Sequence, residues 1–166
     1  MTHARTPRRA ARIAVLAPDG ATFLFRYDNS EVGVHWSLPG GGLDPGESTR
    51  EGARRELGEE TGWFDIEPGP LLCTWEHDYT RGGVPVRQHE HIYLGYLTPG
   101  PRRELGPGLA AAHAEDGILD WRWWTPAELA TAEEALWPPT LATLLAEHRT
   151  RDGAPVHLGY VPNGPR

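Results

Sequence analysis

The chain contains no lysine, because all 16 of its lysine-or-arginine positions are arginines. This excludes the phosphate-binding lysine of a P-loop and a lysine that forms a Schiff base with its substrate. The single cysteine, Cys73, cannot form a disulfide within the chain, which fits a reducing compartment and predicts a cytoplasmic protein. The sequence contains no Gly-x-Ser-x-Gly elbow, which would indicate a serine nucleophile, and no cysteine–histidine pairing, which would indicate a thiol nucleophile. The sequence therefore gives no support to most covalent mechanisms.

Long apolar runs and an excess of positive charge are also lacking. No apolar run approaches the roughly 20 residues that a membrane span requires, and the N-terminus has no apolar stretch suited to a signal peptide. The formal net charge is −7, so no contact with a nucleic acid polymer is expected. An acidic protein still binds phosphates when a divalent cation bridges the two.

The size and composition of the chain predict one globular domain. It has 166 residues, of which 39% are hydrophobic and 23% are charged, and this is ordinary for a single domain with a core. We expect the domain to occupy residues 11–150, between a flexible tail at 1–10 and a weakly structured tail at 151–166. The four arginines of the N-terminal region fit a solvated tail, with a phosphate-binding arm or a transit peptide as alternatives: Arg5, Arg8, Arg9 and Arg12.

Strand and helix patterns alternate irregularly along the chain. Runs typical of strands occupy residues 11–17, 22–27, 70–79, 86–97 and 118–124, with a short extended piece at 32–38. Helices are predicted at about 49–60, 126–136 and 139–149, the last two beginning with proline. Residues 81–83 form a hairpin turn, and residues 98–117, rich in proline, glycine and alanine, form a loop. This order favours an α/β protein with a mixed sheet covered by helices.

The chemistry-bearing residues are concentrated between Leu38 and Trp63. A glycine-rich loop runs into the first helix, which Ser48 caps and Gly62 ends. Three glutamates of this helix share one face near its C-terminal end: Glu56, Glu59 and Glu60. Two carboxylates about 6 Å apart repel each other by roughly 3 kcal/mol at an effective dielectric near 20. A hard divalent cation, Mg²⁺ or Mn²⁺, would relieve this repulsion, and a solvated acidic face partly neutralised by arginine is the alternative.

The same segment resembles the signature of the Nudix hydrolases, a family that includes the MutT-like enzymes. The pattern is GX5EX7REUXEEXGU, where U is a bulky apolar residue. The chain meets it at every fixed position: Gly41, Glu47, Arg55, Glu56, Leu57, Glu59, Glu60, Gly62 and Trp63. Strands before this segment and a late strand leading into a helix extend the likeness to roughly residues 10–150. The resemblance implies an α/β/α sandwich with a mixed sheet and a metal site on the loop and helix.

The resemblance also implies roles for these residues. Glu56, Glu59 and Glu60 correspond to carboxylates that bind Mg²⁺ or Mn²⁺, and the carbonyl of Gly41 adds a ligand. Glu47 and Arg55 correspond to an internal ion pair that orients the helix. A carboxylate must take a proton from the attacking water. Glu59 is the first expectation for this base and Glu60 the second, with Glu115 on a later loop as an alternative.

Residues outside the signature suggest the substrate. Arg26, on an early strand, could contact a phosphate. Tyr79 stands 16 residues after Trp63, about where dinucleoside polyphosphate hydrolases tend to have a tyrosine, whereas the proline typical of ADP-ribose hydrolases near that distance is absent. A nucleoside triphosphate or a dinucleoside polyphosphate is therefore expected, ahead of ADP-ribose or a nucleotide sugar. A regulator that binds a nucleotide without hydrolysing it is the alternative function, and a homodimer would agree with the family.

Overall fold

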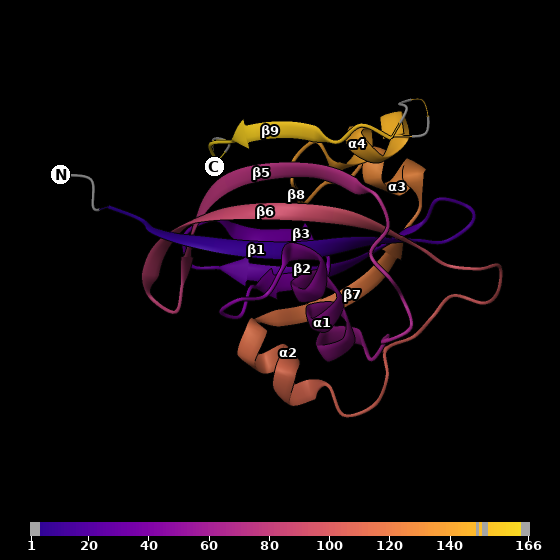
Figure 1. Ribbon diagram of the computed structural model, residues 1–166, viewed down its shortest axis with the longest axis horizontal. Helices are drawn as coiled ribbons and strands as arrows, with labels where there is room; N and C mark the ends of the chain where they lie inside the picture. The colour runs from indigo at the N-terminus through magenta and orange to yellow at the C-terminus, as the bar shows by residue number, and fades with distance from the viewer. Residues whose placement is uncertain (1–3, 149, 151–152, 164–166) are drawn as a thin grey trace.

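The computed structural model describes residues 4–148, 150 and 153–163. Within these residues the chain forms four helices and a nine-stranded sheet (Figure 1). The strands are β1 Thr6–Leu16, β2 Thr22–Asn29, β3 Gly33–Ser37, β4 Gly40–Gly42, β5 Leu71–Arg81, β6 Val84–Tyr96, β7 Ile118–Trp124, β8 Ala135–Trp137 and β9 Val156–Tyr160. The helices are α1 Thr49–Thr61, α2 Ala110–Asp116, α3 Pro126–Ala130 and α4 Leu141–His148. None of the helices in this part of the chain is long and apolar enough to cross a membrane.

The sheet is mixed, as expected. Its order is β8-β3-β2-β1-β6-β5-β9, while β4 pairs with β1 and β7 pairs with β2. Three pairs are parallel, namely β1 with β6, β3 with β8 and β5 with β9. Helices α1 and α2 lie on one side of the long strands, and α3 and α4 lie on the other (Figure 1). The sheet with helices on both sides confirms the expected α/β class.

Strand β1 separates two hydrophobic cores because alternate side chains of a strand point to opposite faces. Ala11 and Ile13 pack with Ala53 and Leu57 of α1 in one core. Ala14 belongs to the other core, which includes residues of α3 and α4 as well as Ile92 and Leu94 of β6. Both faces of the long central strand are therefore covered.

The sheet opens between β1 and β2. These strands are paired at Leu16 and Thr22, and further along β1 the partner changes to β4, so that Ala10–Arg12 lie opposite Gly40–Gly42. One half of the sheet, β1-β6-β5, thus diverges from the other half, which contains β2 and β3. Side chains of both halves line a cavity between them, and this cavity holds the candidate site described below.

A buried polar network crosses the first half of the sheet. Arg12 of β1 donates from Nε to Oε2 of Glu90 on β6 at 2.5 Å, and from Nη1 to the carbonyl of Leu38 at 2.7 Å. Trp75 Nε1 donates to Oε1 of Glu90 at 2.7 Å. Burial alone would raise the pKa of Glu90, but Arg12 and His77 hold it well below its ordinary value. The ionised pair therefore links β6 to the start of the glycine-rich loop.

Both flanking segments contain strands where tails were expected, so the tail predictions are wrong for these residues. Strand β1 begins at Thr6, within the expected tail, and all eleven of its residues pair in parallel with β6, from Thr6–Val86 to Leu16–Tyr96. Strand β9 pairs with β5, and Val156 and Leu158 pack against the core. Residues 1–3, 151–152 and 164–166 of the expected tails lie outside the described residues.

Two predictions in the C-terminal half also need correction. The segment expected as a loop at 98–117 contains α2, whose alanines favour a helix but give no apolar face that a sequence pattern can reveal. The helix expected at 126–136 ends at Ala130. Glu134 instead accepts hydrogen bonds from Trp36 and Arg26, and β8 follows beside β3. The helix expected at 139–149 begins at Leu141; its last residue, 149, lies outside the described residues.

The substitution Glu90→Gln tests the buried ion pair. It leaves Arg12 charged and buried without a carboxylate, and breaking such a pair costs about 3 kcal/mol or more of the free energy of unfolding. Because the pKa of Glu90 is depressed in the folded state, its contribution is present above the ordinary value of 4.5 and is lost as the pH falls below it. Urea unfolding at pH 7 should show the full loss, and the difference from the unmodified protein should shrink in acid.

The matched control is Glu76→Gln on the neighbouring strand, since the Glu76 side chain makes no hydrogen bond or ion pair among the described residues. Equal free energies of unfolding for the two variants would contradict a role for the Arg12–Glu90 pair.

Candidate active site

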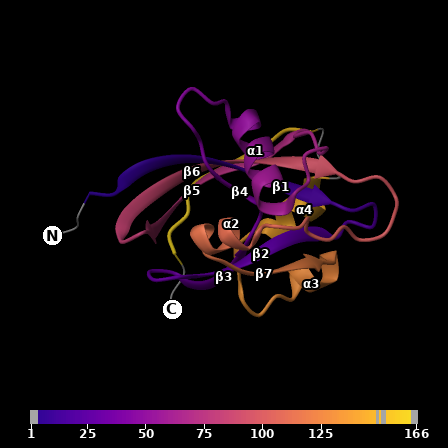
Figure 2. The ribbon, with the colours of Figure 1, turned by 90° about the horizontal axis from the view of Figure 1, so that it is seen from below.

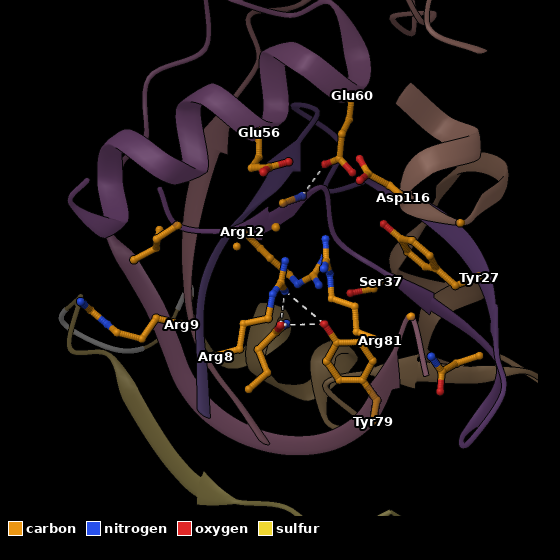
Figure 3. A pocket seen from close by; sticks show the side chains of 18 of the residues that line it. Arg8, Arg9, Arg12, Tyr27, Ser37, Glu56, Glu60, Tyr79, Arg81 and Asp116 are labelled. Carbon is orange, nitrogen blue, oxygen red and sulfur yellow. Dashed lines mark hydrogen bonds between the residues drawn. The ribbon is translucent and has the colours of Figure 1, made fainter. Parts of the chain in front are cut away.

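The cavity between the two halves of the sheet has a volume of about 1230 Å³. One wall is formed by α1, the glycine-rich loop and the end of α2, and it carries carboxylates. The opposite wall belongs to β1, β5 and β6 and carries arginines, with Tyr79 beneath them (Figure 3). Tyr27, His35 and Ser37 line the side contributed by β2 and β3.

The local sequence determines where helix α1 begins and where it ends. The hydroxyl of Ser48 accepts from the N–H of Glu51 at 3.1 Å, and Gly62 ends the helix in the left-handed conformation with φ of 82°. Buried Ala53 and Leu57 hold one face of α1 against β1. Both predicted caps of this helix are confirmed.

The glycine-rich loop packs closely against α1. The N–H of Gly40 donates to Oε1 of Glu60 at 2.7 Å. A Cβ at Gly40 would collide with the carbonyl of Ala11, and a Cβ at Gly41 would lie 2.8 Å from the carboxylate carbon of Glu56. Glycine is therefore needed at position 40 for the close approach of the loop to β1, and at position 41 for its close approach to Glu56.

Three carboxylates meet at this end of the cavity. Glu56, Glu60 and Asp116 each place an oxygen within 4.8 Å of the others, and they form the only such group of potential metal ligands among the described residues. Glu60 is 1% exposed, Glu56 is half-buried, and Asp116 is exposed at the end of α2. Figure 3 shows the three side chains pointing toward one another.

The electrostatics of this cluster favour a bound cation. Burial raises the pKa of Glu60 well above its ordinary value, and the charge of Glu56 adds to the effect. Desolvation likewise raises the pKa of Glu56 and of Asp116, against the opposing charges of nearby arginines. The protein thus gathers ionisable oxygens without supplying enough positive charge of its own. Such an all-oxygen set fits a hard divalent ion.

Arg55, in the middle of α1, joins this helix to the loop that precedes it. Its Nε and Nη2 donate to Glu47 at 2.7 and 2.9 Å, and Nη2 also donates to the carbonyl of Gly42 at 3.0 Å. The remaining nitrogen, Nη1, lies 3.1 Å from Glu56 and 3.2 Å from Glu59. The expected Glu47–Arg55 pair is therefore present, and it also orients Glu56.

Helix α2 brings Asp116 to the cluster through few contacts. It lies beside α1 and β7 (Figure 2) and has no buried residue. Within the described residues, its one hydrogen bond to another helix or strand runs from His113 Nε2 to the carbonyl of Glu60 at 2.7 Å. The ring of His113 also packs edge-on against Phe25. His113 and the turn at Gly117 therefore set the position of Asp116.

The structure brings some of the expected site residues together and separates others. Gly41, Glu47, Glu56, Glu60, Tyr79 and Glu115 line the cavity. Glu59 does not; its side chain is 52% exposed and pairs with Arg55. Arg26 also lies outside the cavity lining, where it pairs with Glu134 at 2.8 Å.

Several cavity residues were missed by the sequence reasoning. Asp116 follows the expected Glu115 directly, but nothing in the sequence indicates which of two neighbouring acids on a loop faces the metal cluster. Arg8 and Arg12 were expected in a solvated N-terminal segment, with a phosphate-binding arm as an alternative, although their alternation with Ala10 is typical of a strand. His77 and Gln88, which also line the cavity, carry no recognisable spacing in the sequence.

Comparison with known proteins identifies the family. The family model described as NUDIX domain matches residues 6–146. The chain is 34% identical over 152 residues to an uncharacterized Nudix hydrolase of Rhodococcus erythropolis, covering 84% of this chain and 76% of the relative. It is 32% identical over 133 residues to an RNA pyrophosphohydrolase of Erythrobacter litoralis (strain HTCC2594), covering 74% of this chain and 78% of the relative. A solved NUDIX hydrolase from Nitrosomonas europaea has a TM-score of 0.66 at 18% identity, covering 96% of this chain and 81% of that one.

The chain therefore belongs to the Nudix hydrolase family. As an enzyme it falls into the pyrophosphohydrolase class of that family. Nudix hydrolases generally use a divalent metal ion and act on small nucleotide substrates. The homodimer and the cytoplasmic location stay predictions.

The substitution Glu60→Gln tests whether the cluster is built for a cation. Because the pKa of Glu60 is raised in the folded state, its ionised form destabilises the metal-free protein increasingly as the pH rises above the ordinary value of 4.5. The variant keeps the oxygen that accepts from Gly40, so its Tm in EDTA at pH 7 should rise; about 1 kcal/mol corresponds to roughly 2–4 °C. The rise in Tm that Mg²⁺ or Mn²⁺ gives the unmodified protein should disappear.

Differential scanning calorimetry with and without metal measures both effects. Glu133→Gln is the matched control, since Glu133 is exposed, lies outside the cavity lining and has no partner among the described residues. A Glu60→Gln protein that melts lower in EDTA, or that keeps its full metal response, would speak against a cation site at Glu60.

Proposed function

We propose that this protein hydrolyses a diphosphate linkage in a nucleoside 5′-polyphosphate, using Mg²⁺ or Mn²⁺ held by Glu56, Glu60 and Asp116. The observation that carries the proposal is the meeting of these carboxylates at one end of a cavity whose opposite wall is cationic. The intact signature segment and the Nudix membership support hydrolysis rather than binding alone. Nucleoside triphosphates and dinucleoside polyphosphates are the favoured substrates, ahead of ADP-ribose and nucleotide sugars.

The proposed metal site combines main-chain and side-chain positioning. Glu60 is held by Gly40, Glu56 by Arg55, and Asp116 by the attachment of α2 through His113. A divalent ion bound here would neutralise phosphate charge and make a bound water more acidic. The carbonyl of Gly41 stays a proposed further ligand, and Glu59 a proposed outer one, since its present partner is Arg55.

The cavity favours Glu115 as the proton acceptor. Of the three candidate bases, Glu59 pairs with Arg55 and Glu60 accepts from Gly40. Glu115 lines the cavity beside Asp116 and makes no hydrogen bond or ion pair among the described residues. Its carboxylate is therefore not engaged by another side chain and could take a proton from a water that attacks phosphorus, provided that this water binds within hydrogen-bond reach of it. This reverses the order of preference that the sequence suggested.

A second candidate substrate is RNA, which similarity to a protein named RNA pyrophosphohydrolase favours. Phosphoanhydride linkages occur in RNA only at a phosphorylated end, so the same metal site would act on a 5′-triphosphate group. The net charge of −7 argues against extended contact with the polymer. An RNA oligonucleotide with a 5′-triphosphate therefore belongs in the substrate panel.

The test is turnover of that panel in Mg²⁺ or Mn²⁺, with products identified by mass. The panel contains nucleoside triphosphates, dinucleoside polyphosphates, ADP-ribose, nucleotide sugars and the RNA oligonucleotide. We expect cleavage of one class, abolished by Glu60→Gln and lowered in kcat by about 10²–10⁴-fold in Glu115→Gln, the usual contribution of a general base. Glu59→Gln tests the earlier candidate, and Glu133→Gln is the control.

The outcomes separate the alternatives. Full kcat in Glu115→Gln with a large loss in Glu59→Gln would return the base to Glu59. Nucleotides that raise the Tm of folded, metal-loaded protein without being cleaved would replace the hydrolase by a nucleotide-binding regulator.

A further inference from the structure

The wall opposite the carboxylates contains arginines, and two of them, Arg8 and Arg81, have no carboxylate partner among the described residues. Arg8, Arg12 and Arg81 come from β1 and the end of β5, and their side chains converge on the middle of the cavity (Figure 3). Across the cavity from them lie the side chains of Glu56, Glu60 and Asp116. Cationic and acidic groups thus lie across one shared space.

The three arginines differ in how their charge is balanced. Arg12 forms an ion pair with Glu90 and also donates to the carbonyl of Leu38. Arg8 donates only from Nη1, to the neutral hydroxyl of Tyr79 at 3.1 Å and to the neutral amide oxygen of Gln88. The side chain of Arg81 makes no hydrogen bond or ion pair with any described residue. Two guanidinium groups with unused donors therefore remain in the cavity.

The side chain of Arg8 packs against the glycine-rich loop, which also packs against the acidic cluster. A Cβ at Gly42 would lie 2.5 Å from Nη2 of Arg8, just as one at Gly41 would lie 2.8 Å from the carboxylate carbon of Glu56. Neighbouring glycines thus give room to an arginine and to a glutamate of the cluster. Burial lowers the pKa of Arg8, and the charges of Arg81 and Arg12 lower it further. A cation in such surroundings is stabilised by an anion that binds between the guanidinium groups.

We propose that Arg8 and Arg81 form an anion subsite that takes a phosphoryl group of the substrate beyond the linkage held at the carboxylate cluster. Guanidinium groups bind phosphate oxygens through paired hydrogen bonds. In this arrangement one end of a chain of phosphates lies at the carboxylate cluster and its other end at the arginines. The subsite selects nucleotides with three or more phosphates over nucleoside diphosphates. This inference rests on the proposed function, because the first phosphates are placed at the proposed metal site.

The substitution Arg81→Ala tests the subsite in turnover. Arg81 is exposed, and its side chain makes no hydrogen bond or ion pair among the described residues. Substrates that differ only in phosphate number are compared in Mg²⁺: adenosine 5′-diphosphate, triphosphate and tetraphosphate. We expect kcat/KM to fall by about 10-fold or more for the triphosphate and the tetraphosphate, as for loss of one hydrogen bond between charged groups, and to change little for the diphosphate.

The matched control is Arg102→Ala, which removes an exposed arginine outside the cavity that pairs with Asp19. It should leave the ratio of kcat/KM between triphosphate and diphosphate unchanged. Arg8→Gln should reproduce the loss seen with Arg81→Ala. Equal losses for all three nucleotides, or no loss for any of them, would overturn the subsite.

A binding measurement separates failure of the subsite from failure of the proposed function. Isothermal titration of inorganic tripolyphosphate into the Mg²⁺-loaded protein needs no turnover. We expect Arg81→Ala to bind it about 10-fold or more weakly than the unmodified protein, and Arg102→Ala to bind it equally well. This result without hydrolysis of any nucleotide would uphold the subsite and refute the hydrolase. Equal affinity in Arg81→Ala, or no binding to any of the proteins, would refute the subsite.

Discussion

The buried carboxylate of Glu60 is the group on which the architecture of the site depends. Its side chain accepts the N–H of Gly40 and so fixes the glycine-rich loop against α1. The main-chain carbonyl of Glu60 accepts a hydrogen bond from His113 and so attaches α2, which carries Asp116. One residue therefore joins the loop, the helix and the later segment that together surround the acidic cluster. Its ionised form is costly without a cation, because burial and Glu56 both favour the protonated form.

The rest of the sheet keeps this costly arrangement in place. β1 leaves β2 for β4, which opens the cavity, and the long parallel pairing with β6 supports the open edge. The Arg12–Glu90 pair crosses that support and ties it to Leu38 just before the loop. The stabilising contacts thus surround the cavity. The two walls of the cavity carry charged groups whose charge is balanced only when a metal ion and a polyanion bind. Such local conflicts are typical of functional sites.

The sequence predicted those parts of the site that local rules determine. The caps of α1, its acidic face and the glycines before it follow from spacing and capping chemistry alone. Asp116, Arg8 and Arg12 could not be placed, because their positions depend on contacts distant in sequence: His113 with Glu60, and β1 with β6. Polar residues of β1 looked like a solvated tail, since only pairing with β6 makes them cavity residues. Glu59 was expected in the cluster by resemblance, yet its partner here is Arg55.

Anomalous diffraction from crystals soaked in Mn²⁺ tests the central claim most directly, because it locates the metal without relying on activity. The structure predicts an anomalous peak at bonding distance from carboxylate oxygens of Glu56, Glu60 and Asp116, on the cavity side of α1. A peak bound only by Glu59 on the exposed face of α1, or no peak in protein saturated with Mn²⁺, would contradict it. Either of those results would mean that Glu60 is buried without a bound cation, in the protonated form that its surroundings favour.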